Sequence, residues 1–119
     1  ELDRAEAALR ASADNAGLDG VLAREGLGYV AEARAAAAKD PTERQRLLEA
    51  ARVAFAKAQP ADGGVRRDYA LYHEARMLAE LGKPAEAKTR LEKALELVPA
   101  SEIELDIQQR LAQLEAAAP

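Results

Sequence analysis

The segment from Asp68 to Ser101, DYALYHEARMLAELGKPAEAKTRLEKALELVPAS, decides the fold that we expect for this chain. Its apolar residues recur with helical spacing on both sides of a short turn. Gly82 can adopt the left-handed conformation that ends the first helix, and Pro84 fits the first turn of the second. Pro99 cannot continue that second helix and therefore ends it. The segment predicts two antiparallel helices joined by a tight turn.

Small residues stand where these two helices would cross, and larger ones surround them. Two antiparallel helices approach closely only where both carry small side chains at the crossing. The spacing and the 34-residue length resemble the tetratricopeptide (TPR) repeat. That resemblance implies a binding scaffold and not an enzyme. The positions that carry it are Leu71, Ala75, Leu78, Ala87, Leu91 and Ala94.

Helical spacing continues along the rest of the chain and predicts about six helices without a strand. Asp19 and Asp40 are expected N-caps, the latter with Pro41 in the first turn, and Ser101 is expected to open a capping box. The expected fold is all-α, a TPR-like α-solenoid of antiparallel helix pairs. It forms one domain, 1–119, in four parts: a half-repeat helix at 1–17, an extended first helix pair at 18–60, the TPR repeat at 65–100 and a capping helix at 101–117. Residues 60–64 are the expected loop, and the longer first pair should project beyond its neighbour near Asp40.

Composition excludes several classes of function. Hydrophobic residues make up 49% of the 119 residues but aromatic ones only 3%, and much of the apolar share is alanine. This composition favours thin, closely packed helices over a deep small-molecule pocket. The net charge of −4 and the interspersed basic residues argue against a nucleic-acid partner. The lack of cysteine excludes thiolate metal sites and thiol catalysis.

Three features that suggest chemistry are better explained structurally. Gly26–Ala31 matches G-x-G-x-x-A, but it lies inside a helical pattern and not after a strand. His73, the single histidine, has no companion nucleophile or metal ligand and is expected on a helix surface. Glu25 and Glu74 recur at equivalent positions, which favours a hydrogen bond between helices over acid–base catalysis. We therefore predict no catalytic residue, metal site, cofactor or small-molecule substrate.

One face of the helix that follows Asp68 carries residue types typical of binding sites. Tyr69, Tyr72 and Arg76 are spaced i, i+3 and i+7 and share that face. Tyrosine and arginine are enriched in binding hot spots, and in TPR proteins this face lines the concave groove. The tyrosine rings could instead pack between adjacent helices, and both interpretations stay open. The predicted protein-binding groove consists of Tyr69, Tyr72, Arg76, Glu80, Leu27 and Arg110.

Within the TPR superfamily, the chain resembles bacterial envelope domains, in particular the ancillary subunits of the SecYEG translocon. The residues that carry this likeness are an alanine-rich array, the longer first pair and the segment from Ala8 to Leu18. The resemblance implies a periplasmic or envelope location and contact with exported proteins or chaperones. Because the chain begins with Glu1 and not Met, we expect a trimmed or mature fragment, with any membrane anchor upstream. The alternative function is self-assembly, with a homodimer formed through the N-terminal end.

Overall fold

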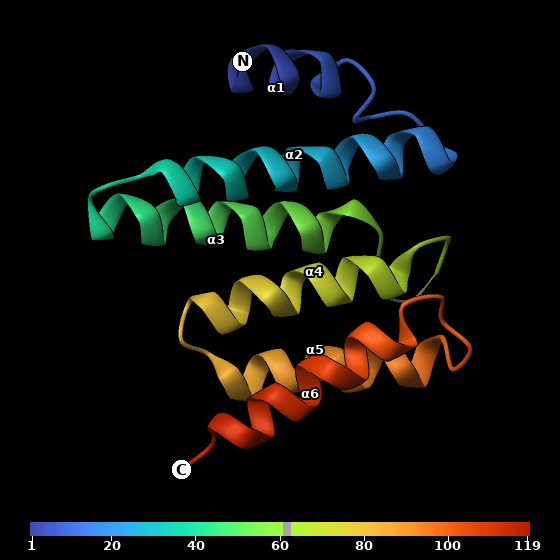
Figure 1. The fold of residues 1–119 in the computed structure, drawn as a ribbon. Helices are drawn as coiled ribbons and strands as arrows, with labels where there is room; N and C mark the ends of the chain where they lie inside the picture. The colour runs from blue at the N-terminus through green and yellow to red at the C-terminus, as the bar shows by residue number, and fades with distance from the viewer. Residues whose placement is uncertain (61–62) are drawn as a thin grey trace.

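The computed structural model describes residues 1–60 and 63–119 and contains six α-helices within these ranges. Consecutive helices run in alternating directions, and each lies beside the next along the chain (Figure 1). The all-α class expected from the sequence is confirmed for the described residues. The molecule measures 40 × 37 × 18 Å, so it is a thin slab. The helices are α1 (Leu2–Arg10), α2 (Gly17–Ala37), α3 (Pro41–Ala58), α4 (Arg67–Glu80), α5 (Pro84–Leu97) and α6 (Glu104–Ala117).

The pair α2 and α3 forms the longest contact in the fold. Asp40 caps α3 as expected, because its side chain accepts a hydrogen bond of 2.9 Å from the backbone N–H of Glu43. Gly28 lets the two helices approach, since a Cβ at this position would lie 2.6 Å from the ring of Phe55. The tip of this pair extends beyond the turn between α4 and α5, as predicted (Figure 1). The buried cluster at this interface consists of Ala35, Leu48, Ala51, Phe55 and Met77.

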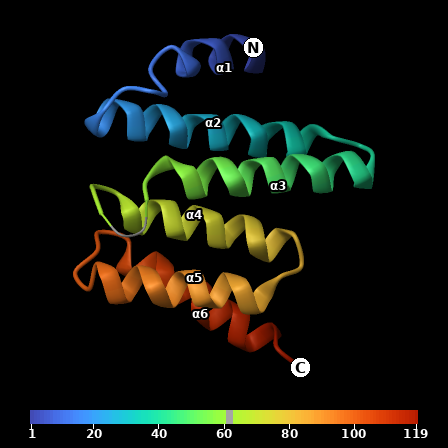
Figure 2. The ribbon, with the colours of Figure 1, turned by 180° about the vertical axis from the view of Figure 1, so that it is seen from behind.

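The pair α4 and α5 corresponds to the segment on which the fold was predicted. Gly82 adopts a left-handed φ of 77°, and the backbone N–H of Lys83 donates to the carbonyl of Leu78, which closes the end of α4. Helix α6 covers this pair and crosses α5 at an angle, in front of α5 in Figure 1 and behind it in Figure 2. The predicted helix-crossing residues are all buried. Their cluster consists of Leu71, Ala75, Leu78, Ala87, Leu91, Ala94 and Ile107.

Two predicted helix starts are wrong. Helix α2 begins at Gly17, so Asp19 lies in its first turn and does not cap it. Helix α6 begins at Glu104, and no capping box forms at Ser101. Instead, the buried Ser101 hydroxyl donates to Asp68 at 2.6 Å and accepts from the N–H of Ile103 at 3.0 Å. The Ser101 side chain, which the local pattern assigned to a helix cap, therefore donates its hydrogen bond to Asp68 of another helix.

Helix α1 ends at Arg10, well before the expected limit at residue 17, and the other helix ends lie within a few residues of the expected limits. Of the expected loop, residues 61–62 lie outside the described residues, and residues 60, 63 and 64 belong to no helix. Helix α1 packs against α2 and leaves most of α2's length uncovered on that side, since it has 9 residues against 21. Among the helices of the described ranges, none combines the length and hydrophobicity required to cross a membrane.

Candidate functional site

The structure brings most of the predicted groove residues of α4 together but gives their charged groups partners within the chain. Arg76 forms two hydrogen bonds with the carboxylate of Glu32 on α2, at 2.7 and 3.0 Å. This contact lowers the pKa of Glu32, mainly through the hydrogen bonds from the guanidinium. A third donor of Arg76, its Nε, lies 3.1 Å from Nδ1 of His73. Arg76 therefore holds α2 and α4 together and has little capacity left for a ligand.

His73 is buried, so the expectation of a surface histidine is wrong. Its ring packs against Phe55, with 4.9 Å between ring centroids, and its Nε2 lies 3.0 Å from the hydroxyl of Tyr29. Because Nδ1 accepts from Arg76, the neutral ring carries its proton on Nε2 and donates to Tyr29. Burial, and then the charge of Arg76, lower the pKa of His73 to about 4. The ring is a neutral link between α2 and α4.

The tyrosines of α4 lie half-buried beside α6. The guanidinium of Arg66 stacks over the ring of Tyr69 at 3.7 Å, and the Tyr69 hydroxyl donates to Glu102 at 3.5 Å. Arg110 of α6 lies 6.0 Å from the centre of the Tyr72 ring. Tyr72 and Arg110 are thus brought together as predicted.

Glu80, in the last turn of α4, pairs instead with Arg44 near the start of α3 at 3.5 Å. Its carboxylate is therefore directed to α3 and is not part of the pair formed by Tyr72 and Arg110.

The two recurring glutamates form the hydrogen bonds between helices that the sequence predicted. Glu25 of α2 is buried and accepts two bonds from Arg66, at 2.6 and 2.8 Å. Glu74 of α4 is also buried and bridges Arg52 of α3, at 2.8 Å, and Arg90 of α5, at 3.1 Å. Both carboxylates therefore serve to connect helices. Neither faces a group that acid–base catalysis would need.

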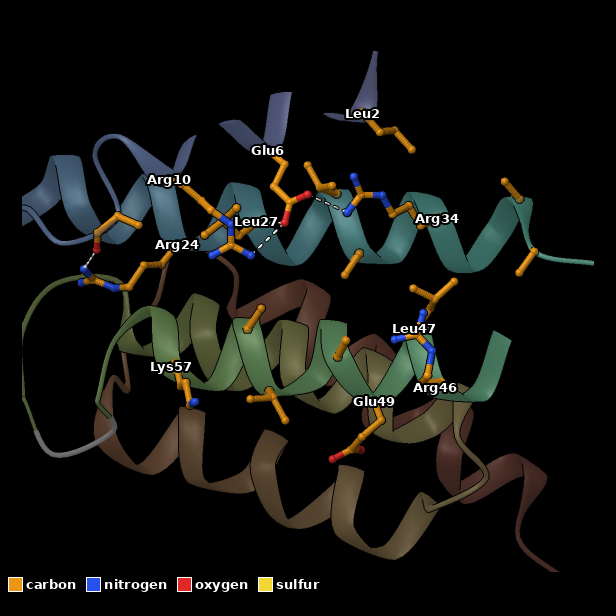
Figure 3. A pocket seen from close by; sticks show the side chains of 18 of the residues that line it. Leu2, Glu6, Arg10, Arg24, Leu27, Arg34, Arg46, Leu47, Glu49 and Lys57 are labelled. Carbon is orange, nitrogen blue, oxygen red and sulfur yellow. Dashed lines mark hydrogen bonds and ion pairs between the residues drawn. The ribbon is translucent and has the colours of Figure 1, made fainter. Parts of the chain in front are cut away.

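Leu27 lies away from the other predicted groove residues, and its inclusion with them is wrong. The side of α2 that meets α4 carries Glu25, Tyr29 and Glu32. Leu27 lies nearly half a turn round the helix from that side, on the floor of a groove between α1 and α3 (Figure 3). When the two helices are aligned so that Glu25 corresponds to Glu74, Leu27 corresponds to Arg76. In the structure, however, the two helices are rotated differently about their axes.

We call this feature, a large open hollow lined by described residues, the α1–α3 groove. It has a volume of about 1160 Å³ and lies over α2, with α1 on one side and α3 on the other (Figure 3). Its floor is made of aliphatic side chains at helical spacing, so two regular stripes face it. Those of α2 are Leu27, Val30, Ala31, Ala37 and Ala38, and those of α3 are Leu47, Ala50, Val53 and Ala54.

Most charged side chains at the rim are paired with one another. Glu6 joins Arg10 and Arg34, at 2.8 and 2.9 Å, and Arg46 binds Glu43 at 2.6 Å. One end differs. There Arg24 donates to the carbonyl oxygens of Ala13 and Ala58, and neither Arg24 nor Lys57 has a carboxylate partner among residues 1–60 and 63–119. The paired charges elsewhere on the rim offset one another, and such exposed pairs contribute little energy. Arg24 and Lys57 therefore give the groove its main electrostatic asymmetry.

A second gap at the equivalent place in the fold shows that the α1–α3 groove is unusual. Between α3 and α5, over α4, the corresponding space is only about 290 Å³. Arg52, Glu74 and Arg90 cross it with their ion pairs. Over α2, the matching glutamate, Glu25, is directed to Arg66 instead. No ion-pair bridge of this kind joins α1 to α3 across the floor in the part of the chain that the structure describes, where Arg24 links the carbonyls of Ala13 and Ala58 at one end only.

The sequence contained a signal for this groove that the prediction missed. Helix α3 has two apolar stripes. The first, at positions 48, 51, 55 and 58, is buried between α2 and α4. The second, at positions 47, 50, 53 and 54, is only partly covered. A second apolar stripe on a helix whose core face is already complete indicates another packing partner.

The structure gives no support to a metal or nucleotide site in the part of the chain that it describes. No group of three or more potential metal ligands occurs among these residues. The G-x-G-x-x-A segment lies within α2, where Gly28 packs against Phe55 and no loop is available for phosphate. Comparison of the chain with protein-family models, with curated proteins and with solved structures found no match. The TPR and bacterial envelope resemblances stay predictions that rest on the residues.

Proposed function

We propose that this chain is a non-enzymatic protein-interaction module with a TPR-like solenoid arrangement, and that it binds a segment of a partner protein in the α1–α3 groove. The observation that carries the proposal is the open apolar floor of that groove. The side chains of Leu27, Leu47 and Val53 are in part exposed to water, and covering them would stabilise a complex by about 25 cal/mol per Å² of apolar surface. The periplasmic or envelope location, with exported proteins as partners, belongs to the same proposal.

A polypeptide fits this groove better than a small molecule does. Small-molecule sites commonly enclose most of the ligand surface. The α1–α3 groove is bounded by helices on two sides and below, and it is open above (Figure 3). An elongated partner would cover the floor and leave its outer side in water, as peptides bound in helical grooves do.

The face formed by Tyr72 and Arg110 is the second surface for a partner, and it was the first choice from the sequence. The ion pair of Arg76 with Glu32 and the contacts of Tyr69 with Arg66 and Glu102 use much of its hydrogen-bonding capacity. Binding there would have to rely on two side chains. The groove offers a larger continuous apolar surface and is therefore the preferred site.

Selection of peptides from a random display library tests the proposal. Ala50 is exposed in the middle of the floor, so Ala50→Glu should abolish groove binding without disturbing the core. Ala112→Glu makes the same change at an exposed position of α6. We expect peptides that bind the parent and the Ala112→Glu variant but not Ala50→Glu. Peptides that bind all three proteins equally would place the site elsewhere, and the proposal would be wrong.

The alternative expected from the sequence is self-assembly through the N-terminal end. Sedimentation velocity over a wide concentration range distinguishes it from partner binding, because it measures the oligomeric state of the chain. The proposal expects a monomer throughout. A dimer that Ala50→Glu dissociates would show that a second copy of the chain occupies the groove. The module would then serve assembly and not capture of a partner.

A further inference from the structure

We infer that the occupant of the α1–α3 groove is an amphipathic α-helix of about four turns, with acidic residues at the end that lies beside Arg24 and Lys57. The inference rests on the proposed function and specifies the partner's chemistry. It follows from three properties of the groove: its length, the nature of its walls and the distribution of charge along its rim.

The length of the groove matches a short helix. Its lining runs from Arg24 to Ala38 on α2 and from Glu43 to Lys57 on α3. Each stretch advances 14 residues, which corresponds to about 21 Å at 1.5 Å per residue. A helical segment of about 14 residues would therefore contact the floor along its whole length.

The walls favour a helix over an extended strand. An extended peptide gains most of its affinity from hydrogen bonds to an exposed strand edge. Here the walls are helices except for Ala13, Asp14 and Ala38 at the ends, and helical backbone groups are paired internally, so the groove offers mainly side chains. The small residues Ala31, Ala50 and Ala54 allow a helix to approach closely, as alanines do between α4 and α5. Leu27, Leu47 and Val53 would fill the spaces around its apolar stripe.

Charge distinguishes the two ends of the groove. Along the middle and at the far end, the rim cations Arg10, Arg34 and Arg46 are balanced by an equal number of carboxylates, those of Asp3, Glu6 and Glu43. At the near end, the lining contributed by residues 1–60 and 63–119 contains Arg24 and Lys57 but one carboxylate, that of Asp14.

The near end therefore keeps a positive charge in a chain whose net charge is −4. Acidic residues at one end of the bound helix would match it and would fix the direction in which the helix lies.

Fluorescence anisotropy with designed peptides tests the inference. The probes are labelled helical peptides of about 14 residues with one leucine stripe. The peptides differ only in their end residues. Two are acidic, one with glutamates in the first turn and the other with glutamates in the last turn; a third carries glutamine at both ends and a fourth carries lysine at both ends. We expect one of the two acidic peptides to bind the parent about fivefold more tightly than the glutamine peptide, since each rim charge pair contributes up to about 1 kcal/mol. The favoured acidic end reports the orientation.

Two variants show whether that preference comes from the groove. Lys57→Glu should invert it, so that the lysine peptide binds more tightly than the acidic one. Lys88→Glu, the same change on the exposed face of α5, should leave it unaltered. A gain of affinity for the lysine peptide cannot result from a loss of folding, so the test stands even if Lys57→Glu lowers stability.

The outcomes separate the inference from the proposed function. If all the peptides bind the parent equally and Ala50→Glu removes binding, the groove binds helices without regard to charge and the inference is wrong. Selected peptides that bind in the groove but show no helical circular dichroism would also overturn it. If neither designed nor selected peptides depend on Ala50, the proposed function itself fails.

Discussion

Gly28 of α2 lies against the ring of Phe55 of α3 so closely that a Cβ on the glycine would stand 2.6 Å from two ring carbons. The contact is part of the longest helix pair in the fold, and it places α3 where it forms one wall of the α1–α3 groove. A glycine in the middle of a helix normally costs about 1 kcal/mol relative to alanine. Its presence here is explained by packing.

Gly28→Ala should therefore destabilise the protein even though alanine is the better helix former. We expect a net loss of up to about 2 kcal/mol in the free energy of unfolding, because overpacking costs up to about 3 kcal/mol and the gain in helix propensity is only about 1 kcal/mol. Urea denaturation measures it. In a Phe55→Leu background the penalty should be smaller, since the ring that causes the clash is absent. A stabilised Gly28→Ala protein would contradict the packing explanation.

The pair of Arg76 with Glu32 should contribute to stability and not to binding. Arg76→Glu would place two carboxylates together in a half-buried site, and we expect a loss of roughly 2 kcal/mol in unfolding free energy. The exchange Glu32→Arg with Arg76→Glu should recover at least part of this loss. Thermal denaturation of the two single variants and the double variant provides the comparison. Equal stability of all four proteins would show that the pair contributes nothing.

Stability should fall as the pH drops from about 6.5 to about 4, because of His73. Its pKa falls from the usual 6.5 to about 4 in the fold, so the unfolded chain binds a proton that the folded chain excludes. The contribution is complete above pH 6.5 and is lost as the pH falls towards 4, by roughly 3 kcal/mol. Unfolding free energies measured across this range test it. The slope should disappear in His73→Gln. The contribution of Glu32, whose pKa is lowered, is lost only as the pH falls below its usual range.

Ser101 should matter more than a helix cap would. Its hydroxyl bonds both the buried Asp68 and the part-buried N–H of Ile103, so Ser101→Ala removes a hydrogen-bond partner from each of these two groups. We expect a loss of about 2 kcal/mol in unfolding free energy. Ser12→Ala is the control, because the hydroxyl of Ser12 makes no hydrogen bond within the described residues. A loss no larger than the control would mean that water replaces Ser101.

The face formed by Tyr72 and Arg110 can be separated from the groove by mutation. Both side chains are only partly buried, and they contact each other across α4 and α6. Tyr72→Ala combined with Arg110→Glu should change the affinity for groove-binding peptides by less than about twofold, since rim charges far from a site contribute little. Anisotropy titrations measure this. Loss of binding in this variant, with Ala50→Glu unaffected, would restore the tyrosine face as the binding site.

Local signals in the sequence were sufficient to predict the helices and the turns between them. Asp40 with Pro41 marked the start of α3, and Gly82 marked the end of α4, because these residues act through their own backbone geometry. The small residues Ala75, Ala87 and Ala94 were correctly placed at a helix crossing, since their spacing reflects one buried stripe on each helix.

The candidate site could be predicted only in part. The spacing of Tyr69, Tyr72 and Arg76 placed them on one face, and Glu25 and Glu74 were recognised as links between helices. The rotation of α2 relative to α4 was not predictable. Because alanine occurs on several sides of α2, more than one side of this helix could face a neighbour. Alignment of the α2–α3 pair with the α4–α5 pair therefore placed Leu27 on the wrong side of α2.

The sequence by itself determined the all-α class, the order of the helices and the residues that α4 and α5 bury at their crossing, because these depend on periodicity and on residues that start or stop a helix. Only the tertiary structure decided which side of α2 meets α4, that His73 is buried and that α1 and α3 stand apart over an apolar floor. These features depend on how side chains from distant parts of the chain pack together. In a chain rich in small apolar residues, many such packings satisfy the same local pattern.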